Sequence, residues 1–283
     1  MDGMNSKKEM ASIVRISTLG RTELAYKVAG TGEPVVFIHG ALSDYRTWSD
    51  QVSEFSDNYK VISYSRRLHY PCAGAPTVEY TRSAHTSDLI DLLDTLNIKD
   101  AHLVGHSYGA SLALLTALRR PDLVKSLVLG EPSPFAELLD DDGFALLAEQ
   151  KRGLGEAAGL AREDRLEEAV GTFLRTVVGV DVLSMLPDEK RAVVLENAGT
   201  LLPMLETYYA SPSLGIKNLT ALQVPALIVS GELSPEISRV SNQSIARYLP
   251  NSREVALRAV SHGLQIEDPE GFNKLVLDFL TSI

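Results

Sequence analysis

Short, continuous runs of apolar residues recur along the chain, and most of them end at a glycine or another turn-forming residue. A strand that is covered on both faces has this pattern, because neither side of it meets water. Segments with helical spacing separate the runs, and this alternation predicts an α/β domain: a mostly parallel sheet flanked by helices. The predicted buried strands are Pro34–Gly40, Tyr59–Tyr64, Ala101–Gly105, Lys125–Leu129, Ala226–Ser230 and Glu254–Val260.

Two earlier runs, Ser12–Ser17 and Glu23–Val28, mix β-branched with polar residues. They predict a half-buried antiparallel hairpin at the edge of the sheet. We expect residues 1–11, ahead of this hairpin, to be disordered. The helical segments are Trp48–Phe55, Ser87–Leu96, Ala110–Leu118, Ser238–Tyr248 and Gly271–Leu280.

The alternation stops between residues 132 and 217, where Leu, Ala, Glu and Arg dominate and no strand-like run occurs. The segment is too long for an ordinary loop, so it predicts a helical cap inserted into the sheet domain. The core then consists of residues 12–131 and 218–283. Helices of the cap are expected near Pro134–Gln150, Arg162–Val178 and Asp188–Leu201.

Composition narrows the classes of protein. Of 283 residues, 37 are acidic and 27 basic, giving a formal charge of −10, which argues against a nucleic-acid partner. The single cysteine, Cys72, excludes an intrachain disulfide framework. Neither a signal peptide nor an apolar run of membrane-spanning length is evident, so we expect a cytoplasmic protein without membrane contact. The sequence leaves the oligomeric state open, with a homodimer as one alternative.

The strongest chemical motif is Gly105-His106-Ser107-Tyr108-Gly109, which lies between a predicted strand and a predicted helix. In that context G-x-S-x-G is a nucleophile elbow: the glycines permit a sharp turn that exposes the serine hydroxyl at the start of the helix. Ser107 is therefore the candidate nucleophile.

A serine hydroxyl needs a base within hydrogen-bond reach, and His262 is the candidate because it follows the last predicted strand. His102 is expected to be a packed or capping histidine, and His85 to face solvent. The oxyanion hole requires backbone N–H groups, for which the candidates are Ala41, after the turn His39-Gly40, and Tyr108 beside the elbow.

Together these residues make the chain resemble the α/β-hydrolase superfamily over Ser12–Ile283. The resemblance rests on the turn at His39-Gly40, the elbow, the inserted cap and the late histidine, in the family's order. It implies the α/β-hydrolase fold. Relatives that cleave haloalkanes or epoxides carry an aspartate at the elbow, so Ser107 favours acyl transfer to water.

The acid departs from the family's commonest pattern. The family usually places an aspartate where this chain has Ser234, and a neutral serine does not stabilise an imidazolium. Some members take the acid from the end of the preceding core strand, where this chain has Glu131. Glu131 is the first candidate and Glu232 the second; a cap-anchoring role for Glu131 and a helix-capping role for Glu232 are the alternatives.

A second departure is the loop Ser65–Pro71, where the family often has an aspartate and glycines. Its Arg66 and Arg67 either pair with an anionic substrate group or hold neighbouring loops through salt bridges, for instance to Asp44 or Asp50. The candidate substrate-binding residues are His39, Gly40, Trp48, His69 and His106. Tyr45 and the cap aromatics Phe135, Phe144, Phe173, Tyr208 and Tyr209 either line a pocket or belong to the core.

No H-x-x-x-H spacing, G-x-G-x-x-G or Walker loop occurs, so we expect neither a metal nor a nucleotide or flavin cofactor. The sequence therefore predicts a cofactor-independent serine hydrolase that cleaves a small-molecule ester, lactone or related acyl bond through an acyl-enzyme. The alternatives are a carbon–carbon bond hydrolase of a diketone-like substrate, and a non-hydrolytic binder or cyclase on the same fold.

Overall fold

The computed structural model describes residues 15–19, 22–72, 79–208 and 214–283. Within these residues eight strands form one sheet, in the order β1-β2-β4-β3-β5-β6-β7-β8. The pairs β1–β2 and β2–β4 are antiparallel, and the other neighbouring pairs are parallel, as predicted. The strands are β1 Arg15–Leu19, β2 Thr22–Ala29, β3 Pro34–Ile38, β4 Lys60–Tyr64, β5 Ala101–His106, β6 Val124–Gly130, β7 Ala226–Gly231 and β8 Ser252–Leu257.

The predicted buried strands coincide with β3 to β7, apart from small differences at their ends. β8 ends earlier than expected, because the chain turns at Ala259, whose φ is 56°, and it also begins earlier, at Ser252. The antiparallel hairpin is confirmed for β1 and β2. The predictions for residues 1–11, and for the start of Ser12–Ser17, lie outside the described residues.

Side chains along the buried strands alternate between two apolar layers, as the period of a strand requires. Val36 and Ile38 of β3 pack into one layer, together with helices α2 Arg82–Thr95, α3 Tyr108–Arg119 and α9 Glu236–Ala246. Val35 and Phe37 pack into the other layer, with α1 Ser49–Phe55 and α11 Pro269–Leu280. The sheet is therefore covered on both faces.

Helix α2 begins earlier than predicted, because the Thr81 hydroxyl accepts a hydrogen bond from the Ala84 N–H and caps the helix. Its extra turn carries His85, which is 1% exposed and packs edge-on against the Tyr80 and Tyr108 rings. The expectation that His85 faces solvent is therefore wrong. His102 is buried against the Ser126 hydroxyl at 2.7 Å, in agreement with the packing role expected for it.

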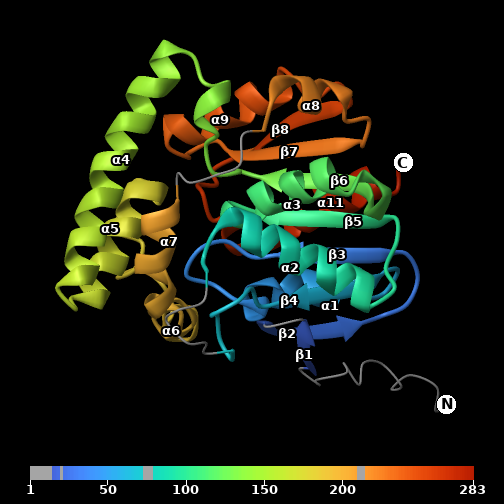
Figure 1. Cartoon of the computed structure of the whole chain (residues 1–283), viewed down its shortest axis with the longest axis horizontal. Coiled ribbons are helices and arrows are strands. Elements are labelled where there is room, and N and C mark those ends of the chain that lie inside the picture. Colours follow the sequence, from blue (N-terminus) through green and yellow to red (C-terminus); the bar gives the residue numbers. More distant parts are fainter. Residues whose placement is uncertain (1–14, 20–21, 73–78, 209–213) are drawn as a thin grey trace.

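Between β6 and β7 the chain forms a helical insertion, residues 132–217, in which the described residues contain no strand. Figure 1 shows α4 to α7 gathered at one end of the strands, on the left of the view. The apolar positions of the insertion follow helical spacing, and the buried ones pack on one another and on the core. The helices of the insertion are α4 Asp141–Arg162, α5 Leu166–Val178, α6 Asp188–Glu196 and α7 Leu201–Thr207, and α8 Ile216–Ala221 leads back into β7.

Candidate active site

Ser107 lies on the sharp turn between β5 and α3. Its φ of 53° and ψ of −118° fall outside the regions that side chains favour, a strain that clusters at functional sites. The turn is tight enough that a Cβ on Gly105 would lie 2.6 Å from Ala110 Cα, and one on Gly109 would collide with the Ile38 carbonyl oxygen. Both glycines of the motif are thus required by close backbone approach.

His262 lies in the loop after β8 and is paired with a carboxylate. Its Nδ1 donates to Glu131 Oε2 at 2.5 Å, and Glu131 is 1% exposed at the end of β6. Glu131 has a φ of 45°, so the backbone is strained at this position too. The bond to Nδ1 leaves Nε2 of the ring available to act as a base.

The Glu131 carboxylate is held in its charged form by its neighbours. Burial acts to raise its pKa, but the hydrogen bond and charge of His262 and the Gly231 N–H outweigh burial, with a smaller contribution from the Ser234 hydroxyl, and leave the pKa below its usual value. The Gly231 N–H donates to Oε1 at 2.7 Å. The Ser234 hydroxyl is buried near the carboxylate without a hydrogen bond of good geometry. The Gly231 N–H, at the end of β7, therefore fixes the second oxygen of the carboxylate.

Glu232, the second candidate acid, is exposed and accepts a hydrogen bond from the Ala259 N–H at 3.1 Å. It therefore stabilises the turn after β8, and the structure brings Glu131, not Glu232, to His262. The alternative in which Glu131 only anchors the cap does not agree with its direct bond to the imidazole.

Two further side chains hold the histidine loop. Glu267 at the end of α10 Leu264–Glu267 accepts hydrogen bonds from the Ser261 N–H at 2.8 Å, the Gly263 N–H at 3.0 Å and the Ser261 hydroxyl. His106 donates from Nε2 to the His262 carbonyl oxygen at 2.7 Å. Burial, followed by the nearby His262 ring, lowers the pKa of His106 to about 3, so this ring stays neutral. Sequence analysis did not identify Glu267.

Ser107 and His262 line one cavity of about 530 Å³, together with Gly40, Ala41 and His106. Tyr108 is the first residue of α3, where backbone N–H groups have no intrahelical partner. Ala41, in the turn after β3, thus lines the same cavity as Ser107, and Tyr108 directly follows Ser107 in the elbow. Gly40 packs so closely against the elbow that a Cβ there would lie 3.4 Å from Ser107 Cβ.

The helical insertion forms the opposite wall of the cavity. This wall is mostly aliphatic, with one aromatic ring from α5. Its apolar residues are Phe173, Leu174, Val177, Val178, Val182, Leu186, Val193 and Val194. Polar side chains from the insertion, Glu189 and Lys190, also line the cavity.

Three of the candidate substrate-binding residues lie away from the cavity lining. Trp48 is fully buried and stacks on Phe37 at 4.9 Å between ring centroids, so it belongs to the core behind the sheet. His39 and His69 are also fully buried, and their rings contact each other. These three predictions are wrong because each side chain packs into the interior.

The aromatic candidates divide between wall and core. Tyr45 and Phe173 line the cavity, Phe135 and Tyr208 are buried in the core, and Phe144 is 48% exposed. Tyr209 lies outside the described residues.

The two arginines of the loop after β4 bind other groups of the protein and do not reach the cavity. Arg67 pairs with Asp88 at 2.6 Å rather than with Asp44 or Asp50. Asp44 instead binds Arg46. Arg66 is 1% exposed and hydrogen-bonds to the carbonyl oxygens of His39 and Gly40. Neither arginine lines the cavity.

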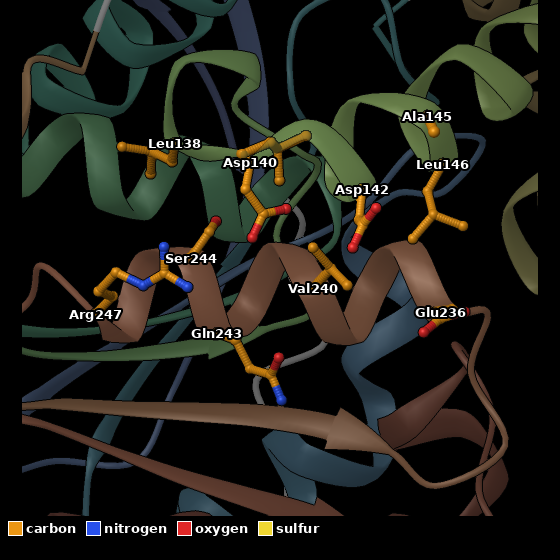
Figure 2. A pocket seen from close by; sticks show the side chains of 11 residues that line it. Leu138, Asp140, Asp142, Ala145, Leu146, Glu236, Val240, Gln243, Ser244 and Arg247 are labelled. Atoms are coloured by element: carbon orange, nitrogen blue, oxygen red, sulfur yellow. The ribbon is translucent and has the colours of Figure 1, made fainter.

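A second hollow of about 440 Å³ lies between the start of α4 and α9. Figure 2 shows Asp140 and Asp142 opposite α9, which carries Val240 and is followed directly by Arg247. No candidate catalytic residue lines it, so we place the candidate site in the larger cavity, which both Ser107 and His262 line.

The described residues contain no group of histidine, cysteine, aspartate or glutamate side chains able to hold a metal ion. In the same part of the chain, none of the helices has both the length and the apolar character needed to cross a bilayer.

Comparison with known proteins identifies the family. The chain is 28% identical over 234 residues to a strigolactone esterase of Arabidopsis thaliana, covering 80% of this chain and 82% of the esterase. It is 26% identical over 271 residues to 2-(acetamidomethylene)succinate hydrolase of Mesorhizobium japonicum, covering 95% of each. The crystal structure of the enol-lactonase from Burkholderia xenovorans superposes with a TM-score of 0.78 at 23% identity, over 94% of this chain and 100% of that one. The model of the alpha/beta hydrolase family matches residues 35–275, and the chain therefore belongs to the alpha/beta hydrolase family.

Proposed function

We propose that the protein is a cofactor-independent serine hydrolase that cleaves an ester, lactone or related acyl bond of a small molecule. The observation that carries the proposal is the hydrogen bond that His262 Nδ1 donates to the Glu131 carboxylate, because it fixes the imidazole tautomer needed for a base. That base faces the same cavity as the strained Ser107.

In the proposed reaction Ser107 Oγ attacks the carbonyl carbon while its proton passes to His262 Nε2. The carbonyl electron pair moves to oxygen, and the N–H groups of Ala41 and Tyr108 hold the oxyanion. The tetrahedral intermediate collapses, and His262 returns the proton to the leaving alcohol. Water then gives a proton to His262 and attacks the acyl-enzyme, which releases the acid and restores Ser107.

The wall of the helical insertion supports an apolar group on the substrate. Its aliphatic side chains offer neither donors nor acceptors to a polar substituent, and apolar surface gains free energy when it leaves water. Among the relatives, the strigolactone esterase has a name that agrees with acyl chemistry.

The decisive experiment is intact-mass analysis after incubation with a small fluorophosphonate, which reacts with an activated serine whatever the natural acyl group. We expect one adduct on the parent protein and none on Ser107→Ala. Ser111→Ala is the matched control, because Ser111 is a fully buried serine one turn further along α3, and this variant should keep the adduct. A folded parent protein that takes up no probe would contradict the proposal.

A further inference from the structure

Arg66 lies directly behind the turn that carries the oxyanion residue Ala41. It follows β4, is 1% exposed and does not line the cavity. Its guanidinium donates from Nη2 to the Gly40 carbonyl oxygen at 2.8 Å and from Nε to the His39 carbonyl oxygen at 3.2 Å. Nη1 donates to the Tyr80 hydroxyl at 3.2 Å. Two of these nitrogens are thus directed at the backbone of the His39–Gly40 turn, and the third at the Tyr80 hydroxyl.

The Gly40 carbonyl oxygen receives a second hydrogen bond, from His39. The Arg66 backbone N–H donates to His39 Nε2 at 3.0 Å, so Nε2 is an acceptor and the ring hydrogen is on Nδ1. Nδ1 then donates to the Gly40 carbonyl oxygen at 2.9 Å. Burial, followed by the charge of Arg66, lowers the pKa of His39 well below 6.5, in agreement with this neutral tautomer. Two donors, one of them charged, therefore hold a single carbonyl oxygen.

Holding that oxygen fixes the opposite side of the same peptide unit. A trans peptide is planar, so its C=O and N–H groups point in opposite directions. With the Gly40 oxygen directed at the buried guanidinium, the Ala41 N–H points away from Arg66. Gly40 and Ala41 both line the cavity on that side. A charge-assisted hydrogen bond to the oxygen also polarises the peptide and makes its N–H a stronger donor.

We propose that Arg66 is a positioning residue of the oxyanion hole, which orients and polarises the Gly40–Ala41 peptide so that the Ala41 N–H meets the oxyanion. The inference rests on the proposed hydrolase function. It names a residue that does not touch the substrate and acts through the backbone.

The surroundings of Arg66 also favour negative charge in the hole. Its guanidinium lies 4.7 Å from the centre of the Tyr108 ring. Tyr108 is the residue whose backbone supplies the second N–H of the proposed hole. Among the described residues Arg66 forms no ion pair, whereas the adjacent Arg67 is paired with Asp88. A buried cation without a direct ion pair stabilises an anion that develops beyond the peptide it holds.

The first test examines the peptide itself and does not need turnover. In NMR spectra of the labelled full-length protein, Arg66→Lys should shift the Gly40 carbonyl carbon and the Ala41 amide resonances. Arg67→Lys is the matched control: it alters the other buried arginine of the same loop, and should leave both resonances in place. Unchanged resonances in a folded Arg66→Lys protein would overturn the inference.

The second test separates the transition state from ground-state binding, with p-nitrophenyl acetate as substrate and phenylboronic acid as inhibitor. Addition of Ser107 Oγ to boron forms an anionic tetrahedral adduct, which uses the oxyanion hole. We expect Arg66→Lys to lower kcat and weaken boronate inhibition, each by roughly 10- to 100-fold, less than the full loss of a direct donor, while KM changes little. Arg67→Lys should leave kcat per folded molecule unchanged.

The outcomes distinguish the two proposals. An active parent protein with unchanged kcat and boronate inhibition in Arg66→Lys overturns the role of Arg66 alone. A parent protein that neither turns over the ester nor takes up the fluorophosphonate contradicts the hydrolase proposal, and the role of Arg66 falls with it. If Arg66→Lys does not fold, Tyr80→Phe removes the hydroxyl that accepts from Nη1 and that also hydrogen-bonds to His69 Nε2 at 2.8 Å. This variant should cause a smaller loss in the same direction, and unchanged kcat there counts against the inference.

Discussion

The sheet core and the helical insertion face each other across the cavity but supply it with different chemistry. From the core come a hydroxyl, an imidazole, a buried carboxylate and the backbone of the turn after β3. The insertion supplies a mostly aliphatic wall, with Glu189 and Lys190 as its polar members. All six histidines of the chain belong to the core, at positions 39, 69, 85, 102, 106 and 262.

If the proposed function holds, bond cleavage depends on the core and substrate choice on the insertion. The core groups are fixed by strand ends, strained turns and hydrogen bonds, so small displacements there should change kcat. The insertion contributes contact area, whose effect grows with the size of the substrate's apolar group. Substitutions in the two parts should therefore give different kinetic signatures.

The largest effect that supports this division is expected from the acid. Glu131→Gln keeps the shape of the side chain but cannot balance the charge on His262, so kcat should fall by about 10³- to 10⁴-fold. Glu232→Gln is the matched control directly after β7, and kcat should stay within about twofold because its exposed carboxylate accepts from the Ala259 N–H and not from His262. Steady-state kinetics with p-nitrophenyl acetate measures both, and equal kcat for Glu131→Gln and the parent would reassign the acid.

A second large effect concerns stability, and it should originate in the core. Burial, followed by the charge of Arg66, lowers the pKa values of His39, His69 and His85 well below 6.5. Below pH 6.5 the unfolded chain takes up protons that the folded chain does not, so stability is kept above this pH and lost as the pH falls. Each histidine costs about 1.4 kcal/mol per pH unit, and the three together lower the free energy of unfolding by about 4 kcal/mol at pH 5.5.

Urea denaturation between pH 7.5 and 5.5 measures this loss. His69→Gln should make the dependence on pH shallower by about one proton, because one of the buried rings is gone. A free energy of unfolding that stays constant over this range would show that the three rings do not remain neutral in the folded state.

A smaller effect is expected from Glu267, which holds the loop of His262, the proposed base. Glu267→Gln replaces one of the carboxylate oxygens that accept from Ser261 and Gly263, so the loop loosens. We expect kcat to fall by roughly 10- to 100-fold with little change in KM, as misplacement of a catalytic group causes. Glu270→Gln, an exposed glutamate at the start of α11, is the control and should retain the parent kcat.

The elbow turn at Ser107 and the pairing of Glu131 with His262 could be predicted from the sequence because their signals are local. The glycines around Ser107 constrain a turn within five residues, and their need is visible in the collisions a Cβ would cause. Glu131 could be predicted because it directly follows a predicted strand, and the carboxyl ends of parallel strands meet at one edge of a sheet. The family resemblance supplied the order in which these signals occur.

The remaining assignments depended on which way a side chain packs, and local sequence does not specify that. His39 and Gly40 are neighbours, yet Gly40 lines the cavity and His39 is fully buried beneath it. Trp48 was assigned to the pocket, but its ring fills the layer between β3 and α11. Glu267 had no distinctive signal, since an acidic residue just before a helix is common for electrostatic reasons alone.

The smallest expected effect tests the insertion, and it is the one that would break the division between core and wall. Leu174→Ala shortens a side chain of the wall, so it should lower kcat/KM for p-nitrophenyl octanoate by about 10-fold while the value for the acetate stays within about twofold. Leu160→Ala is the matched control, because Leu160 of α4 is also partly buried in the insertion but does not line the cavity. Equal losses for octanoate and acetate in Leu174→Ala would mean that the insertion also positions the reacting groups, since a two-carbon acyl group is too short to gain from the lost contact area.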